Sequence, residues 1–188
     1  MNLVSSQLKS VGGFLNPSRI VRHLDIKRGD TVADFGAGHG YFTVPLAKIV
    51  GSDGRVYAID IQKEPLQIIA SKAKAEHLLN VLVIRGDLET SGGSSLKDAT
   101  IDLVLISTML FQAEDKEAVF REAYRVTHEK GILAIIEWDP YDHGGLGPPT
   151  ELRVAKRNVI RMAESVSFKL AREFEAGEHH YGLLFVKQ

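Results

Sequence analysis

One ten-residue segment, from Val32 to Tyr41, constrains the fold of this chain more than any other. It reads as a buried strand with an acidic residue near its end, then three glycines at alternate positions, then the start of a helix. Glycine adopts positive φ angles and lets a ligand approach the backbone closely. A glycine turn between a strand and a helix N-terminus is a typical nucleotide-binding site in α/β proteins. The segment therefore predicts an α/β fold with a ligand at this turn.

The spacing of the glycines distinguishes between kinds of ligand. The dinucleotide fingerprint is G-x-G-x-x-G, and here Tyr41 occupies the position of its last glycine. Gly36, Gly38 and Gly40 instead form G-x-G-x-G, with Asp34 two residues before the first glycine. A tight turn without a ligand would need only one glycine, so the pattern favours a bound ligand. An NAD-dependent oxidoreductase on a similar sheet is the alternative that the spacing disfavours.

Composition limits the class of protein. The 188 residues suit a single domain, 1–188, in which 1–30 form a helical lead-in. A net charge of −1 gives no general attraction to nucleic acid, so no nucleic-acid partner is expected. The absence of cysteine excludes disulfides, thiolate metal sites and cysteine nucleophiles. No apolar run approaches ~18 residues, so we expect no membrane span and a cytoplasmic monomer or homodimer.

Strand-like and helix-like segments alternate from about residue 17 to residue 139, which is typical of a doubly wound, mostly parallel sheet. Strands are expected at 31–35, 55–60, 81–85, 101–106 and 131–138. Helices are expected at 19–24, 41–50, 65–77 and 116–127. Residues 139–149 are rich in glycine and proline and predict an irregular loop at the active site. A helix over 151–166 and an antiparallel hairpin of 168–175 with 181–187 complete the pattern.

Acidic residues mark three successive strands. Asp60 ends the second strand and Asp87 follows the third, just as Asp34 lies near the end of the first. Because ligands in open α/β sheets bind at the carboxyl ends of strands, these acids are expected to border one site. Asp60 could accept both ribose hydroxyls of a nucleoside, or instead cap the following helix. Asp87 could accept from an adenine amino group, or instead form an Asx turn.

These motifs resemble those of class I S-adenosyl-L-methionine-dependent methyltransferases. The resemblance rests on Asp34–Gly40, Asp60, Gly86–Leu88 and Ile101–Val104, with Arg125–Leu133 similar to the segment before the fifth strand. It covers roughly residues 17–138 and is nearest to the ubiquinone/menaquinone-biosynthesis-like branch of small-molecule methyltransferases. It implies a Rossmann-like, seven-stranded sheet with a C-terminal antiparallel hairpin. It also implies methyl transfer to a small-molecule acceptor by in-line displacement, with S-adenosyl-L-homocysteine as the product.

The resemblance also implies which residues hold the cofactor. The glycine loop would receive the carboxylate of S-adenosylmethionine on its backbone N–H groups, and Asp34 would receive the ammonium. Ile61 would lie on the adenine face, although an isolated isoleucine is more commonly a core residue. The expected cofactor residues are Asp34, Gly36, Ala37, Gly38, Gly40, Asp60, Ile61, Gly86, Asp87, Leu88 and Ser107.

Catalytic residues are harder to select, because methyl transfer mainly requires alignment of the two partners and exclusion of water. Asp139 and His143 are the candidate general bases, with a turn-forming aspartate and a loop histidine as the alternative interpretations. Phe111 and Trp138 are the candidate walls of an apolar acceptor pocket, or else core residues.

Basic side chains near the C-terminus offer weaker candidates. Arg153 and Arg157, one turn apart on the expected helix, could steer an anionic substrate or form a solvated face. His179 and His180 are adjacent on or beside a strand and would point to opposite sides, so no metal site is expected.

Two function hypotheses follow from the sequence. The first is an enzyme that methylates a small molecule. The segment Ser107–Leu110 lacks the motif of amino-group DNA methylation, which supports a small-molecule acceptor. The second is a non-catalytic module that holds S-adenosylmethionine and serves a partner protein.

Overall fold

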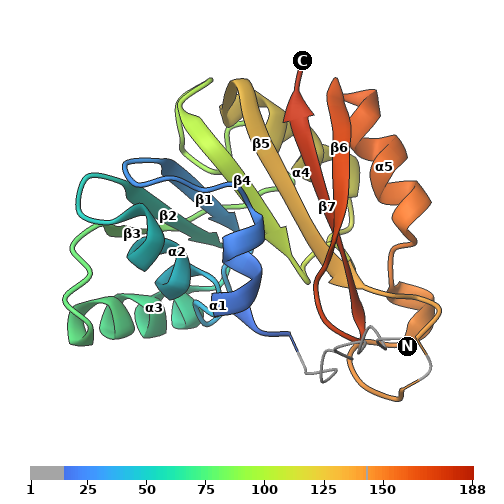
Figure 1. The fold of residues 1–188 in the computed structure, drawn as a ribbon, viewed down its shortest axis with the longest axis horizontal. Helices are drawn as coiled ribbons and strands as arrows, with labels where there is room; N and C mark the ends of the chain where they lie inside the picture. Colours follow the sequence, from blue (N-terminus) through green and yellow to red (C-terminus); the bar gives the residue numbers. More distant parts are fainter. Residues whose placement is uncertain (1–14, 143) are drawn as a thin grey trace, which may run out of the picture.

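The computed structural model describes residues 15–142 and 144–188, and a seven-stranded sheet runs through its centre (Figure 1). The strand order is β3-β2-β1-β4-β5-β7-β6. The strands are β1 (Thr31–Phe35), β2 (Arg55–Asp60), β3 (Val81–Arg85), β4 (Ile101–Ser107), β5 (Thr127–Trp138), β6 (Phe168–Glu175) and β7 (His180–Lys187). The pairs β5–β7 and β6–β7 are antiparallel and all other neighbouring pairs are parallel. The predicted fold class is therefore confirmed.

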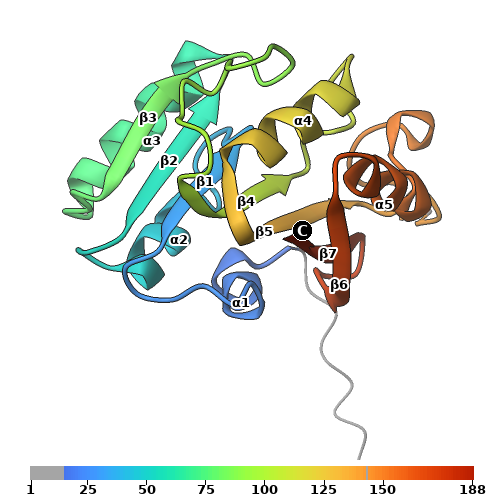
Figure 2. The same cartoon turned by 90° about the horizontal axis from the view of Figure 1, so that it is seen from above.

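Helices cover both faces of the sheet, as the view from above shows (Figure 2). One face carries α1 (Pro17–Ile20), the 3-10 helix η1 (Val21–His23), α2 (Thr43–Val50) and α3 (Lys63–Ala75). The other face carries α4 (Lys116–Val126) and α5 (Lys156–Ser165). Among the described residues no helix is long and apolar enough to cross a membrane.

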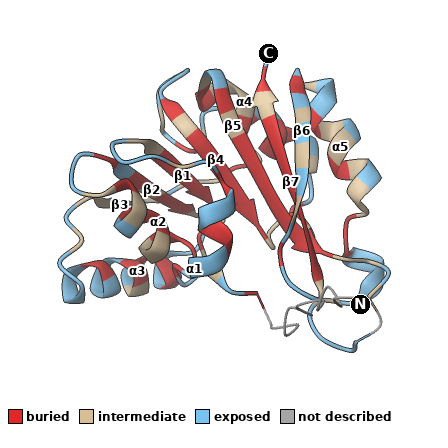
Figure 3. Cartoon of the chain, viewed as in Figure 1, coloured by how far each residue is buried: buried red, intermediate tan, exposed pale blue. Residues whose placement is uncertain are grey.

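The central strands are buried on both sides, which explains their continuous apolar sequences (Figure 3). In β4, Leu103 and Leu105 pack toward α2, whereas Val104 and Ile106 pack toward α4. Successive strand residues point to opposite faces, so a strand between two helix layers has few polar positions available. Polar side chains of these strands are consequently concentrated at the strand ends.

Several predicted element boundaries were inaccurate. The helix expected over 151–166 is wrong, because a short 3-10 helix η2 (Thr150–Leu152) is separated from α5 by extended residues. Arg153 has φ −70° and ψ 139°, an extended conformation that ends η2. Its side chain instead contacts the loop that follows β5, where it donates to the carbonyl oxygen of Asp139. Helix α2 begins at Thr43 rather than residue 41, and β5 begins at Thr127 rather than residue 131.

The described connection between β3 and β4, residues 86–100, contains turns and no helix. A buried carboxylate on α4 anchors it. Glu122 is 2% exposed and accepts N–H bonds from Gly92 and Ser94, each at 3.0 Å. Burial opposes ionisation, but the hydrogen bonds from Arg125, Ser94 and Gly92 outweigh it and lower the pKa of Glu122 to about 2. The side chain therefore stays ionised and holds the connection in place.

Replacing Glu122 with Gln should destabilise the fold, because Arg125 would lose its buried counter-ion. We expect the free energy of unfolding in urea at pH 7 to fall by about 3 kcal/mol. Glu117→Gln, an exposed change on the same helix, should cost under about 1 kcal/mol. Since the folded pKa is depressed, the contribution of Glu122 is present above pH 4.5 and is lost as the pH falls through about 2. Equal losses in the two variants would contradict this role.

Candidate functional site

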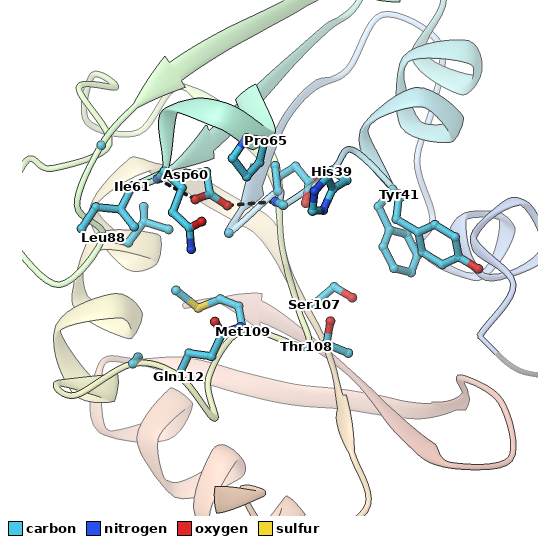
Figure 4. A pocket seen from close by; sticks show the side chains of 18 of the residues that line it. His39, Tyr41, Asp60, Ile61, Pro65, Leu88, Ser107, Thr108, Met109 and Gln112 are labelled. Atoms are coloured by element: carbon cyan, nitrogen blue, oxygen red, sulfur yellow. Dashed lines mark hydrogen bonds between the residues drawn. The ribbon is translucent and has the colours of Figure 1, made fainter. Parts of the chain in front are cut away.

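A cavity of about 650 Å³ opens at the carboxyl ends of β1, β2, β3 and β4 (Figure 4). This volume lies within the range of ordinary small-molecule sites. Its lining comes from the segments that follow each of the four strands, joined by Leu15. The lining residues are Leu15, Asp34, Gly36–His39, Tyr41, Phe42, Asp60–Gln62, Pro65, Gly86–Glu89, Ser107–Met109, Gln112 and Ala113.

The glycine loop shapes the cavity through two of its three glycines. Gly36 has φ +70°, and a Cβ there would lie 2.5 Å from Cγ of Met109. Gly38 has φ +49° and faces open space in the cavity lining. Gly40 does not line the cavity. It has φ +77°, and a Cβ there would lie 2.8 Å from Cγ1 of Ile69 on α3, so the absence of a side chain lets the loop pack on that helix. Gly40 thus contributes to packing, and its predicted contact with the ligand stays a prediction.

Asp34 is a buried carboxylate that lines the cavity. It is 2% exposed, and Thr43 donates a hydrogen bond from Oγ1 to its Oδ2 at 2.6 Å. Burial raises the pKa of Asp34 to about 6, with the hydrogen bond from Thr43 opposing and the charge of Asp60 adding. A positively charged ligand group beside Asp34 would stabilise its ionised form.

Asp60 connects the end of β2 to the glycine loop. Its Oδ2 accepts the N–H of Gly38 and its Oδ1 accepts the N–H of Gln62, both at 2.9 Å. Gln62 rather than Asp60 is the N-cap residue of α3, so the capping alternative does not describe Asp60. A carboxylate has about four lone-pair positions, which leaves Asp60 able to accept further hydrogen bonds from a ligand.

Two apolar side chains border the next part of the cavity. Ile61 is 55% exposed and Leu88 is 4% exposed, and both belong to the lining. The alternative of Ile61 as a core residue therefore fails. Asp87 accepts the N–H of Glu89 at 3.0 Å, which is the Asx turn considered from the sequence, and it also lines the cavity. Gly86 lines the cavity as well, and a side chain there is excluded because an added Cβ would lie 2.1 Å from the carbonyl oxygen of Gly93.

The segment after β4, residues 108–113, forms the opposite wall of the cavity together with Ser107 at the end of the strand, across from Asp60 and Ile61 (Figure 4). The Oγ of Ser107 is buried and has no hydrogen-bond partner among the described residues. An unpaired buried hydroxyl at a cavity wall indicates a polar ligand. The sequence identified Ser107 but assigned no role to Met109 or Gln112, which line the same wall. Both residues follow the carboxyl end of β4, which lies at the same edge of the sheet as the ends of β1 and β2, and this position could have indicated them from the sequence.

The charge of the cavity is one-sided. Its lining includes Asp34, Asp60, Asp87 and Glu89 and, among the described residues, neither lysine nor arginine. This surface favours a ligand that carries positive charge and hydrogen-bond donors.

The remaining predicted site residues lie elsewhere. Phe111, Trp138 and Asp139 do not belong to the cavity lining, and His143 falls outside the described residues. Trp138 is 8% exposed and its ring lies 4.0 Å from the ring of His180, centroid to centroid. Trp138 is therefore packed in the loop region that follows β5.

Arg153 holds that loop together. It is 9% exposed, and its guanidinium donates to the carbonyl oxygens of Asp139, Asp142, Leu146 and Pro148. It also lies 5.5 Å from the ring centroid of Trp138. The guanidinium is thus committed to the loop, and neither substrate steering nor a solvated face describes Arg153.

Comparison with known proteins identifies the family. A family model described as a methyltransferase domain matches residues 26–177. The chain belongs to this methyltransferase family. The sheet order and the glycine loop agree with the class I form of the family, which uses S-adenosylmethionine.

Curated relatives of this chain are named as methyltransferases of demethylmenaquinone or of ubiquinone and menaquinone biosynthesis. A demethylmenaquinone methyltransferase of Geobacillus stearothermophilus is 30% identical over 118 residues, which are 63% of this chain and 49% of the relative. The chain thus spans about half the length of the curated relatives it matches.

Solved structures resemble this chain over nearly its whole length. A SAM-dependent methyltransferase from Aquifex aeolicus has a TM-score of 0.84 at 28% identity, covering 93% of this chain and 90% of that chain. The [4+2]-cyclase SpnF has a TM-score of 0.76 at 16% identity, covering 90% and 79%. The second likeness concerns the fold alone, so the reaction must be argued from the site.

Replacing Arg153 with Lys should loosen the loop, because an ammonium cannot reproduce the planar fork that binds four carbonyl oxygens. We expect hydrogen exchange of the Tyr141 and Gly144 amides to accelerate at least about tenfold, measured by NMR. Arg157→Lys, an exposed change on α5, serves as the matched control and should leave both amides unchanged. Unchanged exchange in Arg153→Lys would contradict the anchoring role.

Proposed function

We propose that this chain is a methyltransferase that transfers a methyl group from S-adenosylmethionine to a small-molecule acceptor. The observation that carries the proposal is the cavity at the carboxyl edge of the sheet. There a glycine loop, the buried carboxylate of Asp34 and the carboxylate of Asp60 converge within one acidic lining.

The residues present fit S-adenosylmethionine. When bound, it supplies a methyl carbon activated by a sulfonium. The positive charges of its sulfonium and ammonium suit the acidic lining, and Asp34 would hold the ammonium. The free lone pairs of Asp60 would accept the ribose hydroxyls, and Ile61 with Leu88 would enclose the adenine. The open backbone at Gly38 leaves room for the amino-acid end.

The acceptor would approach the wall formed by the segment after β4. Met109 offers an apolar surface there, and Thr108 and Gln112 offer hydrogen-bonding groups. Alignment of the acceptor and exclusion of water are the main tasks for these side chains. His39 also lines the cavity, which makes it a nearer proton acceptor than Asp139.

Replacing Asp60 with Asn tests the cofactor site. The amide group of Asn would face one of the two N–H donors that Asp60 now accepts, and a charge-assisted acceptor for ribose would be lost. We expect S-adenosylhomocysteine to bind at least about tenfold more weakly in isothermal titration calorimetry.

The matched control is Asp102→Asn. Asp102 accepts the N–H of Thr31 at 2.7 Å at the opposite edge of the sheet, so affinity should change less than about threefold. Failure of the wild-type protein to bind S-adenosylhomocysteine at millimolar concentration would refute the proposal. Binding without turnover of radiolabelled methyl groups on a broad acceptor panel would instead support the non-catalytic module.

The pH dependence of binding tests the role of Asp34. Ionisation of Asp34 is needed to pair with the ligand ammonium, and burial raises its pKa to about 6. Affinity for S-adenosylhomocysteine should therefore rise about tenfold between pH 5 and pH 7, with release of a proton on binding. In Asp34→Asn this rise should disappear. A rise that persists in the variant would assign the titration to another group.

A further inference from the structure

Glu137 is a buried acid that the proposed reaction does not use. It lies near the end of β5, is 0% exposed and does not line the cavity. Its Oε1 accepts two N–H groups from the segment after β4, those of Met109 at 2.9 Å and Leu110 at 2.8 Å. A single carboxylate oxygen therefore fastens two consecutive amides of a neighbouring loop.

The segment after β4 begins with a residue in an unfavourable backbone conformation. Thr108 has φ +49°, a backbone conformation that β-branched residues seldom adopt. Its N–H donates to the carbonyl oxygen of Ile136 at 2.8 Å. Two adjacent residues of β5, Ile136 and Glu137, thus hold three consecutive amides of the segment. The strained conformation persists because these bonds determine it.

This segment forms the cavity wall that faces Asp60 (Figure 4). Met109 packs so closely on Gly36 that a Cβ on the glycine would lie 2.5 Å from Cγ of Met109. A shift of the segment would therefore alter both the wall and the glycine loop. The anchor in β5 controls the shape of the cavity from outside it.

The surroundings of Glu137 oppose its ionisation. Burial raises the pKa of Glu137 to about 7, and the backbone N–H groups of Leu110, Met109 and Trp138 and the charge of Lys116 on α4 oppose this rise. On the β7 side it faces Tyr181, whose pKa is raised by burial and by the charge of Glu137. The Oε2 of Glu137 has no hydrogen-bond partner among the described residues. Among the described residues no cation forms an ion pair with Glu137, so its charge depends on the N–H groups that it accepts.

We propose that Glu137 is a positioning residue whose carboxylate, through the amides of Met109 and Leu110, fixes the wall against which the methyl acceptor is aligned. The consequence for the reaction rests on the proposed function, whereas the anchoring itself rests only on the hydrogen bonds. Charge-assisted hydrogen bonds are roughly twice as strong as neutral ones, which gives the ionised acid its advantage over an amide.

The test compares Glu137→Gln with the wild type by hydrogen exchange of single amides in NMR, without any ligand. Thr108 serves as the internal reference, because its amide is bonded to the backbone of Ile136. Tyr181→Phe is the matched control, because it removes the buried hydrogen bond from Tyr181 to the carbonyl of Val154 beside Glu137 without touching the segment.

At pH 8 we expect Glu137→Gln to reduce the protection of the Met109 and Leu110 amides at least about tenfold relative to Thr108. Tyr181→Phe should leave this ratio unchanged. An unchanged ratio in Glu137→Gln, or an equal loss in Tyr181→Phe, would overturn the proposal.

The wild type provides a second measurement that does not depend on folding of a variant. Because the carboxylate is ionised above about pH 7, the protection of the two amides relative to Thr108 should be larger at pH 8 than at pH 5.5. A ratio that is constant with pH would contradict anchoring by the ionised acid.

A kinetic measurement addresses the reaction itself. With an acceptor that the radiolabel panel identifies, Glu137→Gln should lower kcat at least about tenfold and change KM for S-adenosylmethionine less than about threefold. A normal kcat would refute the positioning role. The amide measurements need neither cofactor nor acceptor, so failure of the wild type to bind S-adenosylhomocysteine would refute the proposed function alone.

Discussion

Backbone N–H groups donated to buried or partly buried carboxylates shape this site. Asp60 accepts from the glycine loop, Glu122 accepts from the β3–β4 connection, and Glu137 accepts from the segment after β4. A strand that ends at the edge of a sheet leaves the amides of the following loop without ladder partners, and such groups must be satisfied elsewhere. An ionised carboxylate can accept several of them at once. Asp60 and Glu137 hold two segments that line the cavity. Glu122 holds the later part of the connection whose first residues, Gly86–Glu89, also line it.

The buried acids Glu122, Glu137 and Asp34 differ in how their charge is compensated. Glu122 has Arg125 beside it, and its pKa falls to about 2. Glu137 has no comparable counter-ion, and burial raises its pKa to about 7. Burial raises the pKa of Asp34, which lines the cavity, to about 6, and Asp34 likewise has no cation paired with it among the described residues. A cationic ligand in the cavity would offset the cost of burying the Asp34 carboxylate. The amides of the segment after β4 offset the same cost for Glu137, which lies behind the cavity wall.

The sequence predicted the part of the site that follows from local patterns. Acids at strand ends and glycines at a strand-to-helix turn led to Asp34 and Asp60, because parallel strands bring their carboxyl ends together. It could not predict Glu137, since a glutamate in an apolar strand gives no sign of bonding to amides 27 and 28 positions earlier. The two roles predicted for Arg153, substrate steering and a solvated face, were wrong for a similar reason, because its carbonyl partners lie in a loop brought near it by folding. Such long-range contacts become visible only in the folded chain.

The most direct test of this account is a crystal structure with S-adenosylhomocysteine bound. We expect the ribose on Asp60 and the adenine between Ile61 and Leu88. We also expect the amides of Met109 and Leu110 to remain bonded to Glu137. A ligand bound away from the glycine loop would contradict the proposed cofactor site. A ligand in that site with the segment after β4 detached from Glu137 would contradict the claim that buried carboxylates set the shape of the cavity.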